Sequence, residues 1–76
     1  MTKKDIEILK KEFGKKILEI RHQKKMSLRE VEYRCSLDNS KISRIEKGKI
    51  NISLSTLTDL ARGLDVHPCE LLKGNP

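Results

Sequence analysis

The side chains most able to take part in recognition chemistry lie between residues 38 and 48, in the segment DNSKISRIEKG. Ile42 and Ile45 are three residues apart, so a helix over this segment turns both of them toward a core. The polar residues then point outward: Asn39, Ser40, Ser43, Arg44 and Lys47, with Lys41 near the boundary. Asn and Arg can bind adenine and guanine edges through two hydrogen bonds, and Ser can bond to either base. Taken alone, the pattern fits either a helix that contacts DNA or a solvated polar face with nothing bound.

Two helix start signals, eleven residues apart, position this segment. Ser27 is followed three residues later by Glu30, which is the spacing of a reciprocal capping box. Asp38 can cap the second helix by accepting a hydrogen bond from an amide of its first turn, and Gly48 stands where a left-handed stop is expected. Apolar residues recur at helical spacing between these signals: Leu28, Val31, Cys35, Leu37, Ile42 and Ile45. Two short helices joined by a tight turn form a helix-turn-helix.

A longer helix is expected before this unit, from a cap at Thr2 to near Lys25. Its inward residues recur at spacings of three and four: Ile6, Leu9, Phe13, Ile17 and Ile20. Gly14 interrupts the helix at a cost of about 1 kcal/mol relative to Ala. This glycine either admits a close neighbour or marks where an N-terminal extension, residues 1–11, meets the domain.

The chain after Gly48 is expected to form a loop and two further helices. Residues 49–54 alternate like a strand, but a lone strand is not stable and the sequence offers it no partner. Ser53 then caps a helix whose apolar residues form the centre of the core: Leu54, Leu57, Leu60, Ala61 and Leu64. Asp65 ends this helix in a conformation that Asp tolerates, and Pro68 begins a short final helix. All 76 residues form one domain, with residues 73–76 as a flexible tail.

The charge distribution narrows the choice of partner. Residues 1–49 carry fifteen Lys or Arg against eight acids, whereas residues 50–76 carry two against three. The positive excess therefore lies on the half with the helix-turn-helix, which favours a polyanionic partner. A membrane surface would require an amphipathic helix with Trp or Phe on its apolar side, and the chain has no Trp. Because no apolar run reaches spanning length and no signal peptide is apparent, we expect a cytoplasmic protein without a membrane partner.

Neither a metal site nor a cofactor is expected from the sequence. Cys35 and Cys69 do not make a disulfide framework, and Cys35 falls on an inward stripe where a thiol behaves as a small hydrophobe. The cluster His67-Pro68-Cys69 lacks the second ligand pair of a zinc site. Catalytic constellations of Ser, His and Asp or of Cys and His are not apparent, so we do not expect an enzyme.

Several segments occur together in a recognisable order and spacing. They are Phe13-Gly14, Ile17, Ile20-Arg21, Ser27 through Val31, Leu37-Asp38, Ile42 through Gly48, Ser53-Leu54, Leu57, Leu60-Ala61, Leu64 and Glu70-Leu71-Leu72. In these segments the chain resembles the phage-repressor and Cro-like helix-turn-helix family, also called Xre-like. The resemblance implies an all-α, lambda-repressor-like fold of five helices, binding to double-stranded DNA and a homodimer.

The resemblance and the residue types together assign roles to particular positions. The residues expected to contact bases are Asn39, Ser40, Lys41, Ser43 and Arg44, and those expected to contact phosphates are Ser27, Leu28, Arg29, Lys47, Lys49 and Asn51. Arg21 and Glu46 occupy positions that pair in related proteins, which implies a structural ion pair. The near-neutral C-terminal segment leaves Val66, Leu71 and Leu72 for a dimer interface.

Three residues depart from the family pattern. Glu32 stands where Ala is usual, Ser36 replaces a turn Gly, and Leu28 replaces a phosphate-binding Gln. We expect Glu32 to point away from the core or find a partner, and Ser36 to adopt a conformation that Gly accepts more easily. Leu28 cannot donate from its side chain, so a phosphate contact there falls to backbone amides.

The sequence predicts a DNA-binding transcriptional regulator that reads an inverted repeat as a dimer. The alternative is a protein-interaction module, such as an antitoxin or a bridging factor, in which DNA binding is secondary. Co-purification with a protein partner would favour that alternative.

Overall fold

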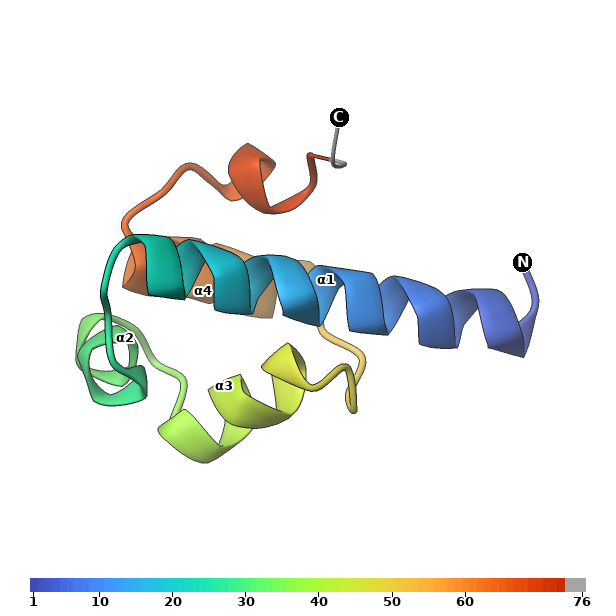
Figure 1. The fold of residues 1–76 in the computed structure, drawn as a ribbon, viewed down its shortest axis with the longest axis horizontal. Helices are drawn as coiled ribbons and strands as arrows, with labels where there is room; N and C mark the ends of the chain where they lie inside the picture. Colours follow the sequence, from blue (N-terminus) through green and yellow to red (C-terminus); the bar gives the residue numbers. More distant parts are fainter. Residues whose placement is uncertain (74–76) are drawn as a thin grey trace.

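The computed structural model describes residues 1–73, and these residues form four α-helices and one short 3₁₀ turn. The elements are α1 (Lys3–Gln23), α2 (Leu28–Arg34), α3 (Asn39–Glu46), α4 (Leu54–Leu64) and η1 (Pro68–Leu71) (Figure 1). The expected all-α fold is confirmed, and the described part of the chain contains no strand. Residues 74–76, most of the tail predicted to be flexible, lie outside the described residues.

The number of α-helices predicted from the sequence is wrong, because the fifth element is a 3₁₀ turn. Its four residues begin with a proline, which has no N–H to donate. A segment this short closes i→i+3 hydrogen bonds, as between Glu70 N–H and the His67 carbonyl at 2.9 Å. The short turn still places Leu71 in the core.

Each α-helix begins at a side-chain cap of the kind the sequence indicates. Thr2 and Asp5 form a capping box at α1, and Ser27 and Glu30 form another at α2. Ser53 caps α4 by accepting from the Thr56 amide at 3.2 Å. Hydrogen bonds from the Thr2 backbone and then from its hydroxyl hold the pKa of the Asp5 carboxyl below its ordinary value.

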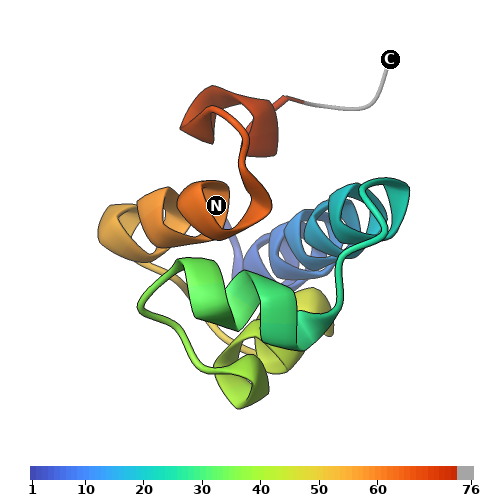
Figure 2. The same ribbon diagram turned by 90° about the vertical axis from the view of Figure 1, so that its left-hand side faces the viewer.

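The core lies between two pairs of helices. The turned view in Figure 2 shows α2 and α3 on one side, α1 and α4 above them, and η1 beyond. In this arrangement α1 packs on α3, while α4 packs on α2 and η1. The side chains with no exposed surface come from each of the four helices: Ile17, Val31, Ile42, Leu60 and Leu64. No helix in residues 1–73 combines the length and the apolar character that crossing a bilayer requires.

Three helices end in the same left-handed motif, and only one of them uses glycine. Lys25, Gly48 and Asp65 have φ values of 56°, 70° and 56°. In each case the next residue donates back into the helix, as from Met26 N–H to the Arg21 carbonyl at 2.9 Å. The stops at Gly48 and Asp65 match the predictions, whereas Lys25 takes a conformation that costs a non-glycine residue about 1–2 kcal/mol. Ser36 does not have a positive φ, so the prediction of a glycine-like conformation there is wrong.

Several apolar residues predicted to be inside are exposed. Leu54 is 79% exposed, because it is the first residue of α4 and side chains of a helix lean toward its N-terminus, here past the edge of the core. Ile6 and Leu9 are 38% and 47% exposed. Their part of α1 extends beyond the other helices (Figure 1), so the inward stripe is fully covered only further along the helix.

Candidate nucleic-acid interface

The two faces of α3 differ sharply in exposure. Ile42 and Ile45 are 0% and 2% exposed and anchor the helix in the core. Asn39, Ser40, Arg44 and Lys47 are exposed on the opposite face, and Lys41 and Ser43 are partly exposed at its borders. The structure therefore brings the predicted base-contacting residues together on one outward surface.

The cations on and after α3 are not engaged elsewhere in the described structure. Within residues 1–73, the side chains of Lys41, Arg44, Lys47 and Lys49 make no hydrogen bond or ion pair. Side chains of this kind can bind an anionic ligand without first breaking a contact inside the protein. This face is thus available to a polyanion.

Two carboxylates hold the N-terminus of α3. Asp38 accepts from the Lys41 amide at 2.7 Å, as its N-cap position indicates. Glu32 reaches across the turn from α2 and accepts from the Asn39 amide at 2.8 Å. Sequence reasoning missed this role, since two residues seven positions apart meet only because of the turn between them. Glu32 finds the partner it was expected to need, and it fixes the start of α3 relative to α2.

An ion pair holds the other end of α3 against α1. Arg21 Nε lies 2.7 Å from Glu46 Oε2, and Arg21 Nη2 lies 3.1 Å from Glu46 Oε1. The remaining guanidinium nitrogen, Nη1, donates to the Met26 carbonyl at 3.0 Å. The two side chains are 12% and 7% exposed. The Arg21 guanidinium therefore links α1, the turn after it and α3, and its contact with Glu46 is bidentate.

Glycines allow the backbones of α1 and α3 to meet at this end. A Cβ at Gly14 would collide with the Ile45 carbonyl oxygen and would lie 2.6 Å from that of Glu46. A Cβ at Gly48 would lie 2.7 Å from the Cα of Lys11. Of the two explanations for Gly14, the structure supports the close neighbour, which is the C-terminal end of α3.

The residues predicted to contact phosphates lie on both sides of α3. Ser27 and Arg29 are exposed at the start of α2, while Lys49 and Asn51 are exposed in the loop after α3 (Figure 1). Leu28 packs its side chain against the core, so a phosphate contact at this position is left to its backbone N–H. Ser27 Oγ already accepts from the Glu30 amide at 3.1 Å.

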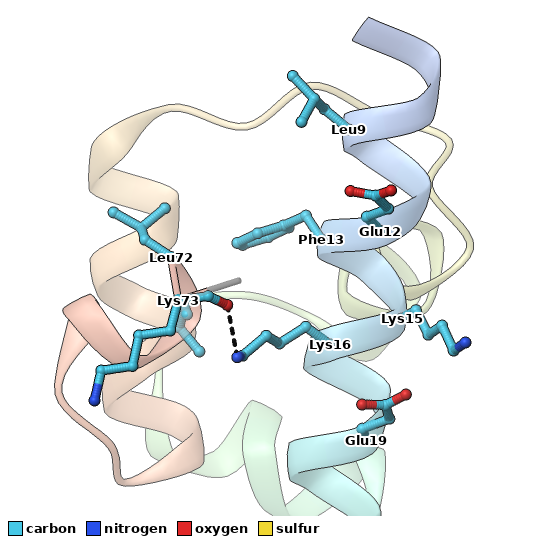
Figure 3. A pocket seen from close by; sticks show the side chains of 9 residues that line it. Leu9, Glu12, Phe13, Lys15, Lys16, Glu19, Leu72 and Lys73 are labelled. Atoms are coloured by element: carbon cyan, nitrogen blue, oxygen red, sulfur yellow. Dashed lines mark hydrogen bonds between the residues drawn. The ribbon is translucent and has the colours of Figure 1, made fainter. Parts of the chain in front are cut away.

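The residues predicted to form a dimer contact are not equally accessible. Val66 is half-buried and Leu72 is 65% exposed, but Leu71 is 2% exposed inside the core. The prediction that the small core would leave Leu71 uncovered is therefore wrong, because η1 turns this side chain inward. Figure 3 shows Leu72 across a groove from Leu9 and Phe13 of α1.

Comparison with known proteins places this arrangement in a family. The model of a helix-turn-helix domain family matches residues 12–73. Control protein C.BamHI from Bacillus amyloliquefaciens is 38% identical over 61 residues, which are 79% of this chain and 75% of that protein. The chain belongs to the helix-turn-helix family. Membership accounts for the shared geometry of α2 and α3 and confirms the resemblance seen in the sequence.

Solved structures show the same fold around this helix-turn-helix. The restriction-modification controller protein C.AhdI from Aeromonas hydrophila superposes with a TM-score of 0.82 at 33% identity, covering 88% of this chain and 97% of that one. The controller protein C.Esp1396I, solved as a tetramer with its 35 base-pair operator, gives a TM-score of 0.74 at 29% identity, covering 86% and 96%. The clp gene regulator ClgR from C. glutamicum shares the fold, with a TM-score of 0.77 at 22% identity over 84% and 83%.

Proposed function

We propose that this protein is a transcriptional regulator without catalytic activity that binds double-stranded DNA as a homodimer in the cytoplasm. The observation that carries the proposal is the outward face of α3. Its polar side chains have no partner within residues 1–73, while the helix beneath them is held at both ends. Because the helix is already held, its backbone loses little conformational freedom on binding, and the cost of ordering falls on the side chains.

On this proposal α3 enters the major groove and contacts base edges. Asn39 and Arg44 form the two-bond contacts that distinguish adenine and guanine, and Ser40 and Lys41 add single bonds near the start of the helix. Ser43, partly covered at the border, contributes less. The buried Ile42 and Ile45 fix which side of the helix faces the bases.

Phosphate contacts on both sides of α3 set the register of the protein on the duplex. Arg29 and the first amides of α2 approach one strand, and Lys47, Lys49 and Asn51 approach the other from the loop after α3. Such contacts contribute affinity and orientation but little sequence information.

Two copies are required because one α3 contacts only a few base pairs. A site this short occurs too often in a genome to be recognised selectively. The basic surfaces would repel each other, so the pairing surface lies on the C-terminal side, where Leu72 is 65% exposed beside the half-buried Val66. Leu71 supports this surface from within the core. The two half-sites then lie about 34 Å apart, one turn of the duplex. The operator-bound tetramer of C.Esp1396I supports assembly of related chains on DNA.

Selection of bound sequences from a pool of random duplexes tests the proposal. We expect an inverted repeat whose half-sites are centred about 10 base pairs apart. If no sequence is enriched above the starting pool and a protein partner is recovered from cell extract, these results would favour the interaction-module alternative.

A further inference from the structure

The lysines of α1 and of the turn after it fall into two groups by their contacts. Lys10 pairs with Glu7 at 3.0 Å, Lys16 donates to the Lys73 carbonyl at 2.7 Å, and Lys24 donates to the Asp65 carbonyl at 2.8 Å. The others are exposed, and their side chains form no hydrogen bond or ion pair within the described chain: Lys3, Lys4, Lys11, Lys15 and Lys25. We call Lys4, Lys11 and Lys15 the lysine stripe.

The members of the lysine stripe share one face of α1. They are separated by seven and four residues, so at 100° per residue they lie within about 40° of one another around the helix. Figure 3 shows Lys15 pointing to the opposite side of α1 from Lys16 and Phe13, which face η1. Lys15 still borders the groove beside Leu72, whereas Lys4 and Lys11 are not among the residues that line it.

The C-terminal end of α3 packs on the neighbouring face of α1. Gly14, within the span of the stripe, packs on the carbonyl oxygens of Ile45 and Glu46. The backbone of Lys11 lies against Gly48, since a Cβ on that glycine would be 2.9 Å from both the Lys11 backbone nitrogen and its Cγ. Gly48 stands between two cations proposed to contact phosphates, Lys47 and Lys49. The stripe thus continues the basic surface of the loop onto α1.

Three of the four acids of α1 lie together to one side of the stripe. Asp5, Glu12 and Glu19 repeat every seven residues and form a parallel stripe about 80° further around the helix. Glu12 and Glu19 line the groove toward η1. The fourth acid, Glu7, lies on the other side of the stripe and forms an ion pair with Lys10 at 3.0 Å. Within residues 1–73 no acid forms an ion pair with Lys4, Lys11 or Lys15, so these three positive charges are available to an anionic ligand.

We propose that the lysine stripe binds the phosphate backbone of DNA and extends the contact beyond the helix-turn-helix. The inference rests on the proposed function, since it assumes that α3 lies in the major groove. In that orientation the N-terminal part of α1, which projects past the loop after α3 (Figure 1), carries Lys4 and Lys11 along the backbone next to the half-site. The stripe adds affinity and footprint length without adding sequence preference.

Salt dependence of binding measures this contact directly. Each lysine–phosphate contact contributes about 0.9 to the slope of log affinity against log salt. Lys4→Gln, Lys11→Gln and Lys15→Gln together remove six contacts from a dimer, so the slope becomes shallower by about 5. The matched control is Lys24→Gln, Arg62→Gln and Lys73→Gln, which removes the same charge from positions away from α3. Thermal melting of both triple variants verifies that each remains folded.

The wild type is measured first on its selected operator, so that failure of the proposed function is seen separately as an absence of specific binding. Given specific binding, the expected result is a shallower slope for the stripe variant, an unchanged preferred sequence, and a control slope close to the wild type. Ethylation interference on the same operator should lose signals flanking the half-sites only in the stripe variant. Equal slopes for the stripe and control variants, with unchanged flanking signals, would overturn the inference.

Discussion

Removal of the Glu46 carboxylate is expected to destabilise the protein severely. In Glu46→Ala, the Arg21 guanidinium keeps its bond to the Met26 carbonyl but loses both bonds to the carboxylate, at 2.7 and 3.1 Å. With the Arg21 side chain 12% exposed, little solvent replaces them. Breaking a buried pair by removing one partner costs about 3–5 kcal/mol.

That cost is large for a chain of this size. At about 0.05–0.15 kcal/mol per residue, the 76 residues have a free energy of unfolding of about 4–11 kcal/mol. Each kcal/mol shifts the melting temperature of such a domain by about 4–8 °C, so the variant should melt at least about 12 °C lower. Thermal and urea unfolding followed by circular dichroism measure both quantities.

A second variant separates a stranded charge from a general loss of packing. Arg21→Met with Glu46→Leu removes both charges and keeps the side-chain volume, and such replacements are often neutral or stabilising. We therefore expect the double variant to recover most of the lost stability. A Glu46→Ala protein that melts like the wild type would refute the reasoning.

Four further predictions concern recognition, helix contact, backbone strain and assembly. Arg44→Ala should cost about 1–3 kcal/mol on the preferred operator and relax one base position, whereas Lys49→Ala should weaken binding equally on all sequences; matching profiles in a competition assay would contradict this assignment. Gly14→Ala should lower the melting temperature although Ala favours helices, because its Cβ would collide with the carbonyl oxygens of Ile45 and Glu46. Lys25→Gly should raise stability by up to about 1 kcal/mol by relieving a φ of 56°, and a loss in urea unfolding would count against strain there. Leu72→Glu should shift a sedimenting dimer to monomer, and a wild type that stays monomeric with and without DNA would remove the proposed interface.

The sequence predicted the elements whose signals are local. Caps such as Ser27 with Glu30 act within one turn, so their residue types and spacing are visible in the chain. The stop at Gly48 follows in the same way from a residue that readily adopts positive φ. The recognition face of α3 could be anticipated because Ile42 and Ile45 fix which side is buried.

What the sequence did not predict depends on where helices end in space. Periodicity marks Leu54 as inward, but its place at the first turn of α4 puts it beyond the core at 79% exposure. The adjacent leucines near the C-terminus differ in exposure: Leu71 is buried and Leu72 is exposed, because a four-residue 3₁₀ turn sets the direction of their side chains. The bond from the Asn39 amide to Glu32 also depends on the geometry of a turn. These features can be predicted only when the packing of the helices is known, because the local sequence pattern does not determine them.

Methylation interference on the selected operator tests the central claim that α3 lies in the major groove. Guanine N7 faces the major groove and adenine N3 faces the minor groove, so methyl groups at these atoms report separately on each. The account predicts two symmetric clusters of interfering guanine N7 positions, about one helical turn apart, and loss of part of each cluster's signal in Arg44→Ala. Interference confined to adenine N3, or guanine signals that Arg44→Ala leaves unchanged, would contradict it.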